Sequence, residues 1–168
     1  MTDKKYELKW IESAGGPYLV RPKGGSDPSW MGVASNDYAD LCDRSPDSYA
    51  EAIDIDDKSL IVLGGEPLPL SVWRNGDDVV IFRWVHGFSD AYLLSFVHNR
   101  ELYTLVESAD VSLSSGSYIV FDSALPDDFD RKLFPSAEFQ VYKPIRSIDT
   151  RVFEPDADHK FLIHFFED

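Results

Sequence analysis

The chain has a single cysteine, Cys42, among its 168 residues. One cysteine excludes an internal disulfide, and its isolation is typical of proteins in a reducing compartment. No apolar run approaches the roughly 20 residues that a transmembrane helix requires. Residues 1–5 are not followed by the apolar stretch of a signal peptide. We therefore expect a cytoplasmic protein that does not contact a membrane.

Basic residues are also scarce. The chain has 16 Lys and Arg against 30 Asp and Glu, a formal net charge of −14. The deficit is greatest in residues 27–80, which hold 12 acids and 3 bases. Such a charge disfavours nucleic-acid binding and favours encounter with a basic protein partner. Its densest acidic groups are Asp54, Asp56 and Asp57, and then Asp77 and Asp78.

Catalytic and metal-binding motifs are missing. No Gly-x-Ser-x-Gly elbow or phosphate-binding loop is present. His159 and His164 lie five residues apart in an expected strand, so they point to opposite faces and do not form a metal pair. Lys58 and Ser59 stand where a calcium loop that begins at Asp54 needs an acid or amide and a glycine. We therefore expect no metal, no cofactor and no catalytic residue.

The densest apolar stretch lies in residues 59–85. Residues 60–63 (Leu-Ile-Val-Leu) read as a strand buried on both faces, and residues 79–85 as a second strand. Gly64, Gly65, Pro67 and Pro69 interrupt them, and the Asn75-Gly76 pair is typical of a hairpin turn. We interpret the two strands as a central pair that the rest of the chain covers, with Val80, Phe82 and Trp84 on one face of the second strand.

The remaining apolar segments are short and mostly alternate in the manner of strands. Helical spacing occurs only in residues 38–44, where Asp37 is a candidate N-cap, and in residues 90–98. The predicted fold is one mainly β domain over residues 1–168, an antiparallel sandwich or roll with one or two short helices. A weak repeat, offset by about 57 residues, suggests two similar strand–turn–strand halves. The further expected strands are residues 6–12, 18–20, 49–55, 102–106, 118–121, 139–142, 150–153 and 161–166.

Several stretches resemble the immunity protein 21 family of bacterial polymorphic toxin systems. They are Trp-Ile-Glu-Ser at residues 10–13 with Gly-Gly-Pro at 15–17, Leu-Gly-Gly-Glu-Pro-Leu-Pro at 63–69, and Phe-Arg-Trp-Val at 82–85. Gly-Ser-Tyr at 116–118 and Phe-Asp-Ser-Ala at 121–124 extend the likeness, which spans about residues 8–125. The resemblance implies a cytoplasmic, non-catalytic antidote that binds and neutralises a toxin domain delivered by competing cells.

Two kinds of function therefore stand beside each other. In the first, the protein is a toxin-binding antidote whose partner is a basic domain encoded by a neighbouring gene. The candidate contacts are then the five acids named above and Trp30, which is either a binding anchor or a lid over the core. In the second, the chain is a small hydrolase that uses paired acids and His86. An acidic nucleic-acid mimic that inhibits a DNA-binding enzyme is a further alternative.

Overall fold

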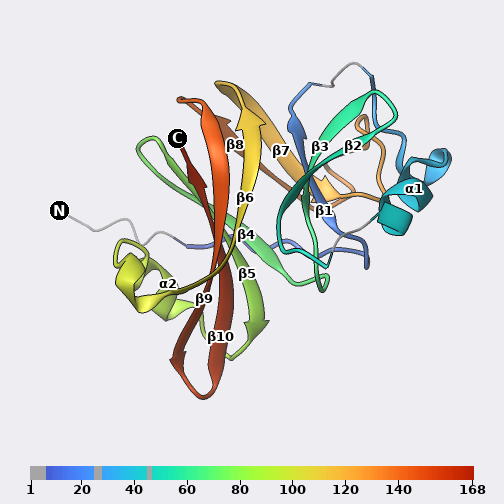
Figure 1. The fold of residues 1–168 in the computed structure, drawn as a ribbon. Coiled ribbons are helices and arrows are strands. Elements are labelled where there is room, and N and C mark those ends of the chain that lie inside the picture. The colour runs from blue at the N-terminus through green and yellow to red at the C-terminus, as the bar shows by residue number, and fades with distance from the viewer. Residues whose placement is uncertain (1–6, 25–27, 45–46) are drawn as a thin grey trace.

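The computed structural model describes residues 7–24, 28–44 and 47–168. Strands make up 48% of it and helices 13%, so the fold is mainly β, as predicted. The strands form two antiparallel sheets of five, which face each other in Figure 1. The protein is therefore a β-sandwich. The expectation for residues 1–5 and the first residue of the expected strand at 6–12 lie outside the described residues.

The first sheet has the strand order β2-β3-β1-β7-β8 and the second the order β4-β5-β10-β9-β6. Two helices and two 3-10 turns complete the fold. The elements are, in chain order, β1 (Tyr18–Pro22), η1 (Gly32–Ala34), α1 (Asp37–Arg44), β2 (Glu51–Ile55), β3 (Lys58–Leu63), β4 (Leu70–Asn75), β5 (Asp78–His86), α2 (Ala91–Phe96), η2 (Arg100–Leu102), β6 (Thr104–Leu113), β7 (Gly116–Asp122), β8 (Ser136–Val141), β9 (Ile145–Asp156) and β10 (His159–Glu167).

The main core lies between the two sheets. It joins Val20 and Leu63 of the first sheet to Ile81, Ile148 and other residues of the second. At one side of the sandwich the carboxylate of Glu107 on β6 accepts hydrogen bonds from the backbone N–H groups of Tyr49 (3.2 Å) and Ala50 (2.8 Å), just before β2. This contact ties edge strands of opposite sheets together, which leaves less of each edge open to pairing with another chain.

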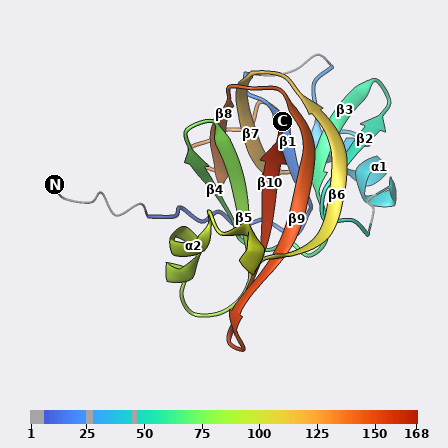
Figure 2. The ribbon, with the colours of Figure 1, turned by 60° about the vertical axis from the view of Figure 1, so that its left-hand side comes forward.

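The outer faces of both sheets are covered as well. On the first sheet, α1 and the loop before it bury Trp30, Leu41 and Phe121. On the second sheet, α2 buries Leu93 against Phe82 and their neighbours. Figures 1 and 2 show α1 and α2 at opposite sides of the sandwich. Because β3 and β5 are covered on two faces, both read as nearly continuous apolar runs.

The alternation predicted for β5 is confirmed, because Val80 and Phe82 pack in the outer cluster while Val79 and Ile81 pack in the main core. The predicted pairing of this strand is wrong. β3 and β5 lie in different sheets, and the hairpin partner of β5 is β4. The Asn75-Gly76 turn does close that hairpin, with Gly76 at a φ of 60°. Because Pro67 and Pro69 favour a turn, the sequence pattern does not predict the strand β4 that follows them.

Other expectations need correction. The expected strand at 6–12 is reduced, within the described residues, to one bridge between Ile11 and Leu70. The repeat does not fold as two equal units, because β7 and β8 pair within one sheet whereas β3 and β5 are separated. Asp37 opens α1, but its carboxylate accepts hydrogen bonds from Met31 N–H (2.8 Å) and Lys58 Nζ (3.1 Å). It therefore anchors the preceding loop.

Arg83 is a charged side chain within the core and has no exposed surface. It points inward from β5, and its guanidinium donates to the carbonyl oxygens of Gly64 and Glu66. Those residues belong to the segment that crosses from β3 in one sheet to β4 in the other. The guanidinium also lies 5.9 Å from the ring centre of Tyr18 on β1. Burial lowers the pKa of Arg83 to about 10, and it stays charged at neutral pH.

An Arg83→Lys variant should be less stable by about 2–3 kcal/mol. The ammonium stays buried, but its nitrogen ends one bond short of the two terminal nitrogens of arginine and lacks their fork geometry, so a buried acceptor loses its partner. Denaturant unfolding measures the loss. The exposed Arg146→Lys is the matched control, expected within about 0.5 kcal/mol of the parent. Equal unfolding midpoints for both variants would show that the fork does not hold the crossing segment.

His164 on β10 predicts a pH dependence of stability. It is fully buried, with Nδ1 2.9 Å from Thr150 Oγ1. Burial first, and then the charge of Arg83, lower the pKa of His164 well below its usual 6.5. The unfolded chain therefore binds a proton below about pH 6.5 that the folded chain excludes. The free energy of unfolding should fall with pH there, by up to about 1.4 kcal/mol per pH unit from this residue. His164→Gln should flatten that slope and the exposed His98→Gln should not; equal slopes in all three proteins would contradict the assignment.

Candidate partner-binding surfaces

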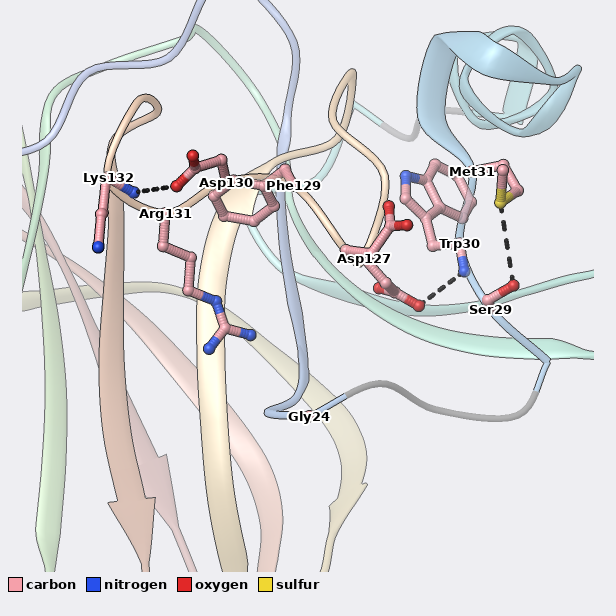
Figure 3. Close-up of a pocket in the computed structure, with 10 residues that line it drawn as sticks. Gly24, Ser29, Trp30, Met31, Asp127, Phe129, Asp130, Arg131 and Lys132 are labelled. Carbon is pink, nitrogen blue, oxygen red and sulfur yellow. Dashed lines mark hydrogen bonds between the residues drawn. The ribbon is translucent and has the colours of Figure 1, made fainter.

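A pocket of about 560 Å³ lies on the outer side of the first sheet, between residues 29–31 and residues 127–132 (Figure 3). Trp30 forms its inner wall but has no exposed surface. Its indole N–H donates to the carbonyl of Ser123 (2.8 Å) and its backbone N–H to Asp127 Oδ2 (2.7 Å). Of the two roles considered for Trp30, the lid over the core describes it. A surface anchor requires exposed area that this side chain lacks.

An ion pair between Arg21 and Asp127 holds the backbone around Trp30 in place. Arg21 on β1 donates to both carboxylate oxygens of Asp127, at 3.2 and 3.1 Å, and to the carbonyl of Pro28 at 3.0 Å. Both charged side chains are more than nine-tenths buried. Asp37 holds the other end of the same loop. Although burial opposes it, the hydrogen bonds from Met31 and Lys58 lower the pKa of Asp37 below its usual value. The loop is thus pinned at both ends.

The outer rim of the pocket is mixed in character. Asp128, Asp130 and Lys132 are exposed, and Arg131 contacts Glu138 at 3.3 Å. Met31 adds a thioether that is 41% exposed. The hydroxyl among these lining residues, that of Ser29, donates to Met31 Sδ (3.9 Å), and no histidine stands beside it in the lining to act as a base. The pocket is therefore suited to contact with another molecule and carries no arrangement for covalent chemistry.

The predicted acidic contacts are all exposed but do not form one surface. Asp54, Asp56 and Asp57 lie at the turn between β2 and β3, where Asp56 has a φ of 51°. Asp77 and Asp78 lie at the turn between β4 and β5. β2 and β4 are edge strands on opposite sides of the sandwich, so a single partner surface of ordinary size would meet one group first (Figure 1).

The histidines do not support the hydrolase alternative as stated. His86 is exposed, and its Nδ1 lies 3.1 Å from the backbone carbonyl of Asp158. The histidine that pairs with an acid is His159, 2.8 Å from Asp156, and it is 1% exposed. The hydrogen bond from His159 lowers the pKa of Asp156 below its usual value. Among the described residues no group of three His, Cys, Asp or Glu side chains is placed to hold a metal ion.

The sequence pattern does not predict a group of exposed aromatic side chains before and along α2. Leu93 and Val97 of the α2 region are buried, as helical spacing predicts, but Tyr92 and Phe96 on the same apolar stripe are 36% and 38% exposed. Phe88, just before the helix, is 82% exposed. The apolar stripe of the helix is wider than the part of it that packs on the sheet. The number of apolar residues in residues 88–97 exceeds what so short a helix can bury, and this excess is the signal in the sequence that indicates an exposed apolar surface.

The comparison with protein families decides what kind of protein this is. The family model of Immunity protein 21 matches residues 9–144, more than half of the chain. The chain belongs to the Immunity protein 21 family. No curated protein and no solved structure matches it. The family assigned from the sequence resemblance is therefore confirmed.

Membership of the Immunity protein 21 family gives the chain an immunity role, which implies a partner toxin and is generally non-catalytic. The matched region ends just before β9. It includes the pocket, both acidic turns and α2, whereas the β9–β10 hairpin that completes the second sheet lies beyond it. Within the described residues no helix is long and apolar enough to cross a membrane.

We expect this family member to need no metal for folding. Prolonged dialysis against a chelator should leave the melting temperature unchanged, because a structural metal site would contribute directly to folding free energy. Elemental analysis of protein purified without a metal-affinity step is the second measurement. Stoichiometric zinc or calcium, or a fall in melting temperature that added metal reverses, would contradict the expectation.

Proposed function

We propose that this Immunity protein 21 family member binds and neutralises a cognate toxin domain of a bacterial polymorphic toxin system. The observation that carries the proposal is the family match over residues 9–144. Neutralisation is stoichiometric, by occlusion of the toxin. It takes place in the cytoplasm of the cell that makes the antidote, in keeping with the single, exposed Cys42 and the lack of disulfides.

Two observations favour binding over catalysis. The one histidine paired with an acid, His159, is almost fully buried under aromatic rings, and His86 contacts a backbone carbonyl. Neither is arranged as a base beside a nucleophile. The acidic surface fits a basic partner, because a net charge of −14 raises the rate of encounter with positive surfaces. We propose that the toxin is encoded by a neighbouring gene.

The decisive experiment pairs the antidote with that neighbouring toxin domain. Co-expression should restore growth of cells that make the toxin, and the two purified proteins should elute as one stable complex. The antidote should be unable to restore growth when the toxin is made in molar surplus over it, as stoichiometric binding requires. Rescue by catalytic amounts of antidote would support the hydrolase alternative. Inhibition of unrelated DNA-binding enzymes would support the nucleic-acid mimic.

Reversal of the densest acidic group should slow toxin binding. We expect the triple change of Asp54, Asp56 and Asp57 to Lys to lower the association rate several-fold and to flatten its salt dependence. Exposed charges act mainly on encounter, and salt screens them over about 8 Å at physiological strength. Stopped-flow binding at low and high salt measures both quantities.

The double change of Asp77 and Asp78 to Lys is the matched comparison, since these acids lie at the opposite edge of the sandwich. A larger effect per reversed charge from the triple change places the approach of the toxin on the β2 side. If neither variant alters the association rate or its salt slope, the acidity of residues 27–80 serves solubility only.

A further inference from the structure

The exposed aromatic residues before and along α2 form a continuous row on the second sheet. Phe88 and Tyr92 both pack edge-on against the ring of His159, with centroid distances of 4.4 and 5.3 Å. Phe96, one turn further along, packs 6.2 Å from Phe153. His159 and Phe153 belong to the β9–β10 hairpin, whose turn forms the lower tip in Figures 1 and 2. We name these three residues, Phe88, Tyr92 and Phe96, the α2 aromatic row.

The row is held in place from beneath. The His159 side chain is 2% exposed, and its Nδ1 lies 2.8 Å from Asp156 Oδ1. Gly87, at a φ of +132°, turns the chain tightly over this ring, so that a Cβ there would lie 2.6 Å from His159 Cδ2. The turn therefore depends on glycine, and it sets Phe88 on a rigid support. Aromatic side chains fixed before binding lose little entropy in a complex, as expected of interface anchors.

The charge around the row identifies the kind of partner. Residues 86–98 and 153–160, which build this surface, hold four acids (Asp90, Glu154, Asp156 and Asp158) and one base, Lys160. The surface is acidic, and the whole chain carries −14. A second copy of the chain would bring like charge to it, whereas a basic protein surface would be attracted.

Another exposed apolar group, near the pocket, is a weaker candidate. Met31, Val33, Leu133 and Phe134 lie in or beside the segments that form the pocket of Figure 3. Residues 28–34 and 124–135 hold three acids and two bases. Acids are paired on both surfaces, Asp127 with Arg21 here and Glu154 with Lys160 near the α2 aromatic row, so the surfaces are compared by their totals of acids and bases. This surface is nearly balanced in charge. It has less to attract a basic partner.

We propose that the α2 aromatic row, with its acidic surroundings, is the anchor of the interface with the basic toxin domain. This inference rests on the proposed function and assigns it a surface. The aromatic rings supply the buried contact that sets the dissociation rate, and the acids around them steer the approach. The interface then joins α2, within the family match, to the β9–β10 hairpin beyond it.

The test measures binding of the neighbouring toxin domain to single Phe88→Ala and Tyr92→Ala variants of the full chain. Each should raise Kd by about 30-fold or more, chiefly through faster dissociation, as hot-spot truncation does. Leu133→Ala and Phe134→Ala are the matched controls, because they remove exposed apolar side chains from the opposite side and should change Kd less than about threefold. Melting curves check that all four variants stay folded, as expected of exposed positions.

The outcomes separate this inference from the function on which it rests. If the wild-type protein binds the toxin and both α2 variants bind equally well, the assigned surface is wrong and the proposed function stands. If the toxin does not bind the wild-type protein, the proposed function fails and the inference fails with it. Mass measurements in solution add a further check: a wild-type dimer that Phe88→Ala dissolves would show that a second copy covers the row, and would overturn the inference.

Discussion

The buried guanidinium of Arg83 holds in place the segment that connects the two sheets of this protein. Arg83 extends from β5 into the core and binds the carbonyl oxygens of Gly64 and Glu66, in the segment that crosses from one sheet to the other. The carbonyl groups of a crossing segment have no partner in a strand ladder, and a buried one, such as that of Gly64, is costly if left unpaired. One planar guanidinium satisfies two of them. Tyr18, whose ring lies 5.9 Å from the guanidinium, holds the crossing segment at a further point, because its hydroxyl donates to the carbonyl of Leu68 (3.0 Å).

Buried and half-buried acidic residues also stabilise the fold. The carboxylates of Asp37, Asp122 and Asp127 accept hydrogen bonds from backbone N–H groups of loops that cover the first sheet, and the carboxylate of Glu107 joins the edges of the two sheets in the same way. Part of the large negative charge is therefore structural. The acids at the two hairpin turns are of another kind, since they are exposed. A charge total does not separate these roles, whereas burial and hydrogen bonding do.

The same distinction applies to the aromatic residues, on which an interface depends. Trp30 stands in a loop rich in glycine, serine and proline, where a tryptophan draws attention as an anchor, yet the pinned loop buries it completely. Phe88, by contrast, lies in an inconspicuous turn and is 82% exposed. The loops therefore decide which aromatic rings are uncovered and available for contact with a partner. The rigid support beneath the α2 aromatic row suits it to that task.

The sequence by itself determined the strand-rich class, the alternation of β5, the two short helices and the family. Each of these depends on contacts between near neighbours in the chain or on motifs read directly. Only the tertiary structure decided that β3 and β5 belong to different sheets, that the acidic turns lie at opposite edges, and that Trp30 is covered while Phe88 is not. These features depend on pairing between distant segments, and short apolar strands resemble one another too closely for local pattern to choose among partners.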